Sequence, residues 1–188
     1  NGFVFMDRNL GATVTGAESH GLYYQWGRKD PFRKPSGSPL NVDTLTTSAD
    51  NLAKSIAHPD TFYVSLSSPY DWIGPNQNNN LWSTVDDEKA QYDPCPFGWR
   101  VAVVKNDADG SPWNGFTSNT YNGASYPLAG YLDGFSGHLV GNTGGVWGAS
   151  ARARDGFVFK FTSAPGSGTA TSALRTNAYP VRCVKDIR

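Results

Sequence analysis

Two segments near the C-terminal end decide the expected fold: residues 147–161, WGASARARDGFVFKF, and residues 175–186, RTNAYPVRCVKD. The run at 157–161 alternates in the way that is typical of a β-strand with one packed face. Around it, residues 148–174 are dominated by Gly, Ala, Ser and Thr. A core strand that passes through such exchangeable residues predicts a fixed scaffold carrying a replaceable surface.

The alternation also predicts which side chains pack. We expect five side chains to be buried: Trp147, Phe159, Phe161, Val181 and Val184. Successive strand residues point to opposite faces, so Phe157, Lys160 and the side chains of residues 151–155 should face solvent and be free to vary.

The rest of the chain predicts short elements between glycine-rich turns. Strands are expected at residues 3–6, 22–27, 99–104, 126–131, 146–147, 157–161 and 181–184. Residues 47–57 should form a helix capped by Ser48 or Asp50, with Leu52, Ala53, Ile56 and Ala57 on its apolar face, and residues 83–91 a second short helix. The predicted fold class is α+β, loop-rich, with two short helices and small antiparallel sheets.

Size and charge limit the classes of function. The 188 residues predict one domain over 1–188, large enough for its own core. Sixteen basic residues balance sixteen acidic ones, so nothing predicts a nucleic-acid partner or an anionic membrane. No apolar run is long enough for membrane insertion. The chain opens at Asn1 directly in a strand-like segment, from which we expect it to be the C-terminal part of a longer protein.

Two cysteines, Cys95 and Cys183, stand 88 positions apart. They are either two unrelated buried thiols or one disulfide, which would place the protein in an oxidising compartment. A bridge closing so long a loop would stabilise the fold by about 4 to 5 kcal/mol in the chain-entropy model. Neither belongs to a C-x-x-C pair, so a zinc site or dithiol redox chemistry has little support.

Four motifs in order resemble a known family. They are MDRNLGA at 6–12, GLYYQWGRKDPF at 21–32, YDPCPFGWRV at 92–101 and PVRCVKD at 180–186. Together they are similar to the Fibrobacter succinogenes major paralogous domain and related surface proteins of gut Bacteroidetes, over nearly the whole chain. The resemblance implies a C-type-lectin-like fold, a Cys95–Cys183 disulfide and an extracellular or cell-surface location, as in a lipoprotein, a fimbrial tip or a phage particle.

The chain departs from this family at two places. Residues 102–104 (AVV) lead into a loop where the family often has a proline and a polar helix, and Gly148-Ala149 replaces a usual pair of serines. With this second difference the chain resembles the variable proteins of diversity-generating retroelements. In these systems adenines of the gene are mutated, and mutation of the adenines of an AAC or AAT codon cannot produce Lys, Glu, Gln, Met or Trp. Only Lys160 belongs to that set between residues 148 and 179, against 17 residues among the first 147. We therefore expect a variable region at about 146–179.

Other chemistry has plainer explanations. Asp107 and Asp109 resemble half of a calcium loop but lack the later glutamate, so a solvated turn is favoured. Three scattered histidines, His20, His58 and His138, show no metal-binding spacing. The acidic run at 86–88 is expected to be a solvated, helix-capping cluster. Trp26, Trp72, Trp82 and Trp99 are expected in the core, whereas Trp113 and Tyr121 are left open.

Arg152 and Arg154 are either solvated loop charges or contact residues, since exposed arginines and aromatics on a rigid scaffold are typical of binding surfaces. The expected ligand-binding residues are Val146, Gly148, Ala149, Ala151, Arg152, Ala153, Arg154, Asp155, Phe157, Lys160 and Thr176. No catalytic residue, metal or cofactor is expected.

Three functions follow in order of preference. The first is a non-enzymatic ligand-binding domain with a diversifiable surface for a protein or glycan on a cell surface. The second is an adhesin or structural tip domain without diversification. The third is a relative of the formylglycine-generating oxidases, whose chemistry would need a reactive cysteine pair.

Overall fold

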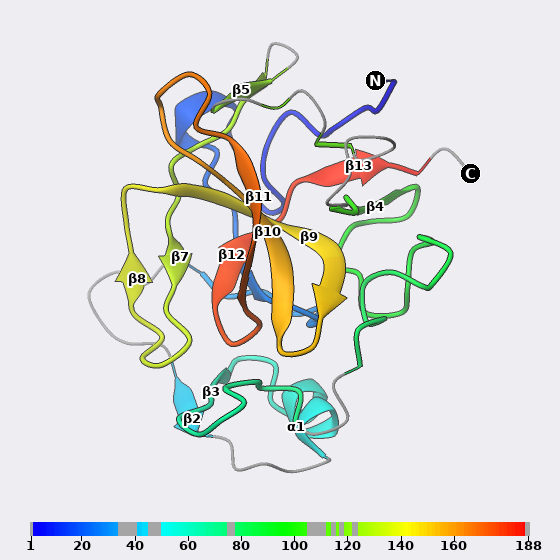
Figure 1. Ribbon diagram of the computed structural model, residues 1–188, viewed down its shortest axis with the longest axis vertical. Coiled ribbons are helices and arrows are strands. Elements are labelled where there is room, and N and C mark those ends of the chain that lie inside the picture. The colour runs from blue at the N-terminus through cyan, green and yellow to red at the C-terminus, as the bar shows by residue number, and fades with distance from the viewer. Residues whose placement is uncertain are drawn as a thin grey trace.

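The computed structural model describes residues 2–33, 41–44, 50–74, 78–104, 112–113, 116, 119–121 and 124–186. Short strands connected by loops make up most of it (Figure 1). The first and last described segments lie side by side, joined by a bridge between Phe5 and Val184. In chain order the elements are η1 (Gly16–Glu18), β1 (Tyr23–Gln25), β2 (Val42–Thr44), α1 (Asn51–Ala57), β3 (Phe62–Val64), β4 (Trp99–Val101), β5 (Thr120–Tyr121), β6 (Ala124–Ser125), β7 (Tyr131–Leu132), β8 (Leu139–Val140), β9 (Gly144–Arg152), β10 (Asp155–Phe161), β11 (Thr169–Leu174), β12 (Ala178–Pro180) and β13 (Cys183–Lys185).

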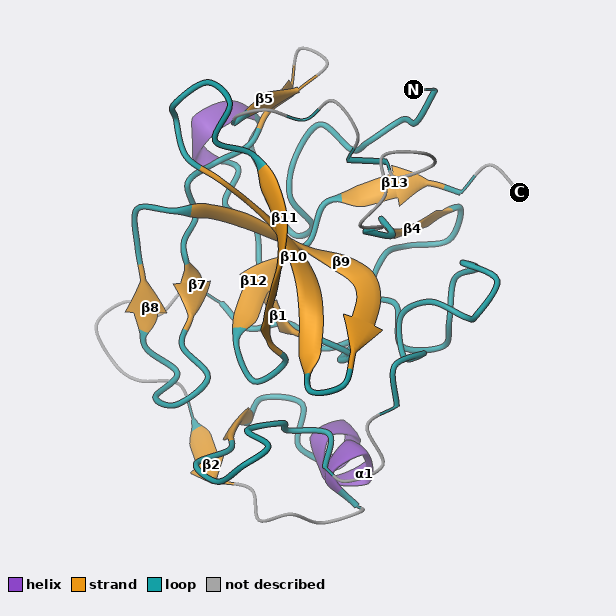
Figure 2. Ribbon diagram, in the orientation of Figure 1, coloured by secondary structure: helices purple, strands orange, loops and turns teal. Residues whose placement is uncertain are grey.

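The strands form several small sheets. Four strands pair in the order β1-β12-β7-β8, and three in the order β11-β10-β9. The remaining pairs are β13-β4, β5-β6 and β2-β3, of which only β2-β3 is parallel among the described strands. Small antiparallel sheets with one α-helix agree with the expected α+β, loop-rich class (Figure 2).

The first predicted helix is present, but its predicted apolar face is wrong. α1 begins after Asp50, and its buried residues are Asn51 and Ser55, while Ile56 is 53% exposed. Of the four residues expected on the apolar face, Leu52 alone packs against the main core. The helix also supplies an acceptor to a buried cation, because Nη2 of Arg28 donates to the carbonyl oxygen of Ser55, and a buried charge needs such acceptors.

The predicted second helix at 83–91 is wrong. The segment is a tight turn closed by a bridge between Ser83 and Lys89. The hydroxyl oxygen of Thr84 accepts hydrogen bonds from the backbone N–H groups of Asp86 and Glu88, a local bonding pattern that competes with helix formation. The acidic run at 86–88 is therefore an exposed turn and caps no helix.

The predicted strands differ mainly in length. Residues 3–6 make one bridge, from Phe5 to Val184, instead of a regular strand, and residues 22–27 form β1 at their centre. The strand expected at 126–131 is wrong for residues 126–130 because Pro127 lacks a backbone donor and Gly130 has a φ of 69°. β11 was not expected, since its sequence TATSAL shows no clear apolar alternation.

The main core is built on four buried tryptophans whose indole N–H groups all reach backbone carbonyls. Trp26 donates to Gly148, Trp72 to Trp26, Trp82 to Arg28 and Trp147 to Tyr24. These bonds satisfy each buried donor and tie strands that are distant in sequence. The core positions expected for Trp26, Trp72 and Trp82 are confirmed, whereas Trp99 is only half-buried.

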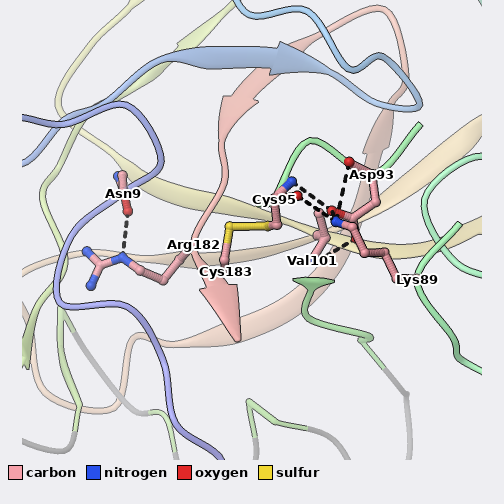
Figure 3. The surroundings of a disulfide bond; sticks show 7 residues. All are labelled: Asn9, Lys89, Asp93, Cys95, Val101, Arg182 and Cys183. Atoms are coloured by element: carbon pink, nitrogen blue, oxygen red, sulfur yellow. Dashed lines mark hydrogen bonds and ion pairs between the residues drawn. A yellow bond between two sulfur atoms is a disulfide. The ribbon is translucent and has the colours of Figure 1, made fainter. Parts of the chain in front are cut away.

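A buried disulfide joins Cys95 to Cys183, with 5.9 Å between the Cα atoms, which confirms the expected pairing (Figure 3). Beside it the Asp93 carboxylate accepts from the backbone N–H groups of Cys95 and Val101 and forms a 2.7 Å ion pair with Lys89. The bridge and this carboxylate together fix β13 and β4 to the turn at Cys95.

Candidate functional site

Four of the expected binding residues do not belong to an exposed surface. Val146 and Ala149 are each 1% exposed, Thr176 is not exposed at all, and Gly148 is buried as well. A Cβ atom at Gly148 would collide with the side chain of Val104, so no other residue fits there without a shift of the core. Placing these four on a variable surface was wrong.

An irregularity in the sheet explains the burial of two of them, Gly148 and Ala149. The register of β9 against β10 shifts between Gly156 and Val158, so residues 148–150 have no regular partners on β10. They bond instead to the segment after β4: the N–H of Ala149 donates to the carbonyl of Ala102, and the N–H of Val104 donates to Oγ of Ser150. The bulged part of β9 is thus hydrogen-bonded to the segment that follows β4.

The other expected residues lie on the hairpin of β9 and β10. Arg152, Ala153 and Arg154 are exposed, and Ala151, Asp155, Phe157 and Lys160 are half-buried. The connecting loop points toward the end of the molecule that carries α1, away from the termini (Figure 1). Ala153 holds a φ of 51°, which is unusual for a residue with a side chain, and so turns the chain sharply between the two strands.

The five side chains expected to be buried are buried, but the hairpin is packed on both of its faces. Trp147, Phe159, Phe161, Val181 and Val184 are all buried, as expected. Phe159 and Phe161 pack on one face, while Val158, 0% exposed, packs with Trp147 in the tryptophan core on the other. The prediction that Phe157 faces solvent is wrong, because this ring is half-buried against the cluster that contains Phe159 and Phe161. Lys160 is half-buried with Nζ 5.8 Å from the centre of the Tyr179 ring. Only the hairpin end near the loop is therefore available to a partner.

A pocket of about 360 Å³ opens at that end. It is lined by Arg152, Ala153, Asp155, Phe157, Thr171 and Ser172. Phe157 and Ser172 are direct neighbours across β10 and β11. Sequence reasoning missed Thr171 and Ser172, because hydroxyl residues in a small-residue run carry no signal that separates a pocket wall from a loop.

The two exposed arginines of the hairpin differ in their surroundings. Nε of Arg154 lies 4.0 Å from Oδ1 of Asp155, and its guanidinium carbon lies 5.9 Å from the centre of the Tyr70 ring. Tyr70 in turn contacts Phe135 edge-on, with 5.7 Å between ring centres. Arg154 is thus held against the body of the protein. The guanidinium of Arg152, in contrast, has no ion pair, hydrogen bond or ring contact with any described residue.

Beneath the hairpin lies a buried ion pair that the sequence did not predict. Nη2 of Arg175 is 3.1 Å from Oδ2 of Asp71. Burial raises the pKa of Asp71 to about 6, against the lowering effect of the Arg175 charge, and burial lowers the pKa of Arg175. Arg175 opens the segment 175–186 quoted above, but the sequence gives no partner for it.

The remaining candidate chemistry finds little support. Among the described residues no three His, Cys, Asp or Glu side chains gather in a possible metal site. The half calcium loop with Asp107 and Asp109 lies outside the described residues. Trp113, whose role was left open, is a core residue: it stacks on Phe159 with 5.3 Å between ring centres and is 4% exposed.

Two smaller hollows lie elsewhere. One of about 220 Å³ separates α1 from Arg28 and Tyr92, and one of about 160 Å³ lies between the turn at Asp87 and Ser150 of β9. Four of the expected binding residues, Arg152, Ala153, Asp155 and Phe157, line the hairpin pocket, whereas two, Ala149 and Ala151, line the hollow at Ser150. We therefore treat the hairpin pocket as the candidate site.

Comparison with known proteins adds no neighbour: no family model, no curated protein and no solved structure matches the chain. No helix in the described part of the chain is long and apolar enough to cross a membrane.

Proposed function

We propose that this chain is a non-enzymatic binding domain that displays an exchangeable surface on a C-type-lectin-like scaffold. One observation carries the proposal: an exposed hairpin end with a pocket stands directly on strands whose other side chains are locked in the core. Loops on a rigid scaffold are the usual place for binding, because their side chains can change with little cost to the fold. The resemblance to the Fibrobacter succinogenes major paralogous domain supports the same function.

The exchangeable surface is narrower than the sequence predicted. It comprises residues 151–155 and Phe157 on the hairpin, with Thr171 and Ser172 on the neighbouring strand. Its exposed positions are Arg152, Ala153, Arg154 and Ser172, and substitutions at exposed positions seldom change stability by more than about 0.5 kcal/mol. In a diversity-generating retroelement these are the codons at which variation would be tolerated.

The disulfide supports an extracellular setting and weakens the oxidase alternative. Cys95 and Cys183 are bonded to each other and almost fully buried, and such bridges persist in oxidising compartments. A formylglycine-generating oxidase would need reactive cysteines at a site open to substrate. A location on a cell surface, a fimbrial tip or a phage particle fits the binding function.

The nucleotide locus separates diversification from a fixed adhesin. We expect a nearly identical template copy of the 3′ segment and a reverse transcriptase gene close by. Differences at template adenines should fall in codons 151–155, 157, 171 and 172, and should spare codon 148, where only glycine fits. A locus with neither component leaves the adhesin without diversification as the function.

A further inference from the structure

The walls of the hairpin pocket combine four kinds of chemistry. Arg152 supplies a cation, Asp155 a carboxylate, Thr171 and Ser172 two hydroxyls, and Phe157 an aromatic ring. The volume of about 360 Å³ falls near the lower end of the range for small-molecule sites. A pocket of this size suits one small ring better than an extended chain.

Arg152 identifies the charge that the pocket would accept. Its guanidinium has no partner among the described residues, while Arg154, two positions on, already lies beside Asp155 and the Tyr70 ring. A free guanidinium presents a planar fork of N–H donors that matches a carboxylate. The missing partner of Arg152 is therefore an anion, best a carboxylate.

The other walls specify what carries that carboxylate. Asp155 and the hydroxyls of Thr171 and Ser172 can exchange hydrogen bonds with several neighbouring hydroxyl groups. Phe157 is half-buried, and its ring can cover an apolar C–H face. Because Arg154 lies 4.0 Å from Asp155, the charge of this carboxylate is partly offset, which favours a neutral hydroxyl over an ammonium group.

We propose that the hairpin pocket binds an acidic sugar, a hydroxylated ring with one carboxylate. The carboxylate pairs with Arg152, the ring hydroxyls bond to Asp155, Thr171 and Ser172, and the apolar ring face lies on Phe157. Binding needs no metal ion. This inference rests on the proposed binding function and narrows its ligand to a terminal sugar acid of a glycan.

The test titrates the purified protein with sodium glucuronate and sodium N-acetylneuraminate, using saturation-transfer NMR to obtain affinities. Glucose, acetate and alanine test, in turn, a ring without a carboxylate, a carboxylate without a ring and a zwitterion. At least one acidic sugar should bind tenfold or more tightly than all three. Added EDTA should leave its affinity unchanged.

Two arginine variants provide a charge-matched pair. Arg152→Gln should weaken the acidic sugar by at least tenfold, since charge-assisted bidentate bonds are lost, whereas Arg154→Gln should weaken it by less than threefold. Arg152→Lys keeps the charge without the fork and should fall between them. Melting temperatures of all three variants show whether each is folded.

Three results would overturn the inference: no binding of either acidic sugar, tighter binding of alanine than of both, or equal losses in Arg152→Gln and Arg154→Gln. The last would indicate diffuse positive charge in place of a pocket. None of these results would contradict the proposed binding function, because that function is tested separately by the genes that surround this one. Likewise, a locus without a template copy and a reverse transcriptase gene would not contradict a measured affinity for acidic sugars.

Discussion

Arg175 and Asp71 form an ion pair of 3.1 Å in which neither side chain is exposed to solvent. Arg175 also donates through Nη1 to the carbonyl of Asn78 and through its backbone N–H to the carbonyl of Arg154. A single buried arginine thus joins three segments beneath the hairpin. The proposed exchangeable surface thus lies on segments that this arginine holds together.

Replacing this arginine should be costly. Arg175→Met leaves the Asp71 carboxylate buried without its partner, and removing one member of such a pair typically costs about 3 to 5 kcal/mol. Urea unfolding at neutral pH measures the loss. Arg152→Met removes an exposed arginine and should change the free energy of unfolding by less than about 0.5 kcal/mol. A loss below about 1 kcal/mol in Arg175→Met would mean that the pair does not support the fold.

The same pair predicts a dependence on pH. Burial raises the pKa of Asp71 to about 6 from a usual 3.8, so between these values the folded state holds more protons than the unfolded chain. The stability from this group is therefore present below about pH 4 and is lost as pH rises through about 6. In Arg175→Met the pKa should rise further, so the deficit in unfolding free energy should be larger at about pH 7.5 than at about pH 5. A deficit independent of pH would contradict this.

Gly148→Ala should destabilise the protein, because the added methyl group meets the side chain of Val104. Overpacking of this kind typically costs about 1 to 3 kcal/mol. Thermal and urea unfolding measure it, with the exposed Ala153→Ser as a control of similar size. An unchanged free energy of unfolding in Gly148→Ala would mean that this position tolerates other residues after all.

Phe161→Ala should cost about 3 to 5 kcal/mol, since Phe161 is 2% exposed and packs in a cluster with Phe116, Tyr126 and Phe159. Phe97 offers a matched control because it is fully exposed on its turn. Phe97→Ala should therefore be close to neutral in the same urea titration. Equal effects of the two substitutions would mean that the faces of β10 are assigned wrongly.

The disulfide predicts a mass and a stability. The intact protein made under oxidising conditions should be two hydrogens lighter than its reduced form, by mass spectrometry. Reduction should lower the free energy of unfolding by about 2 to 5 kcal/mol. Two free thiols in the intact protein would contradict both the bridge and the extracellular setting.

The expected burial of Phe159 and Phe161 is confirmed, but Val158 between them is buried as well, so β10 packs on both faces and the alternation did not identify a free face. The composition of residues 148–150 led to the wrong prediction that they are exposed, because a small residue can occupy a position for either of two physical reasons. Some are small because they are exposed and exchangeable, and others because a neighbour leaves no room. Gly148 is of the second kind, pressed against Val104, and no pattern within β9 distinguishes the two.

The missed elements share a different cause. Local patterns do not reveal the contacts of these two segments. The carbonyl of Ser55 in α1 accepts from the distant Arg28, and the turn at residues 83–89 is held by side-chain bonding of Thr84. The pocket needed the pairing of β10 with β11, which brings Ser172 beside Phe157. Tertiary contacts of this kind override local propensity.

The most direct test of an exchangeable surface on a fixed scaffold compares two matched libraries, each randomised at four codons. One varies the exposed Arg152, Ala153, Arg154 and Ser172, and the other the buried Val146, Gly148, Ala149 and Thr176. The measurement is the folded fraction of each library, as protease resistance on a display surface. We predict that most members of the exposed library fold and that few of the buried library do. Equal folded fractions would contradict the account.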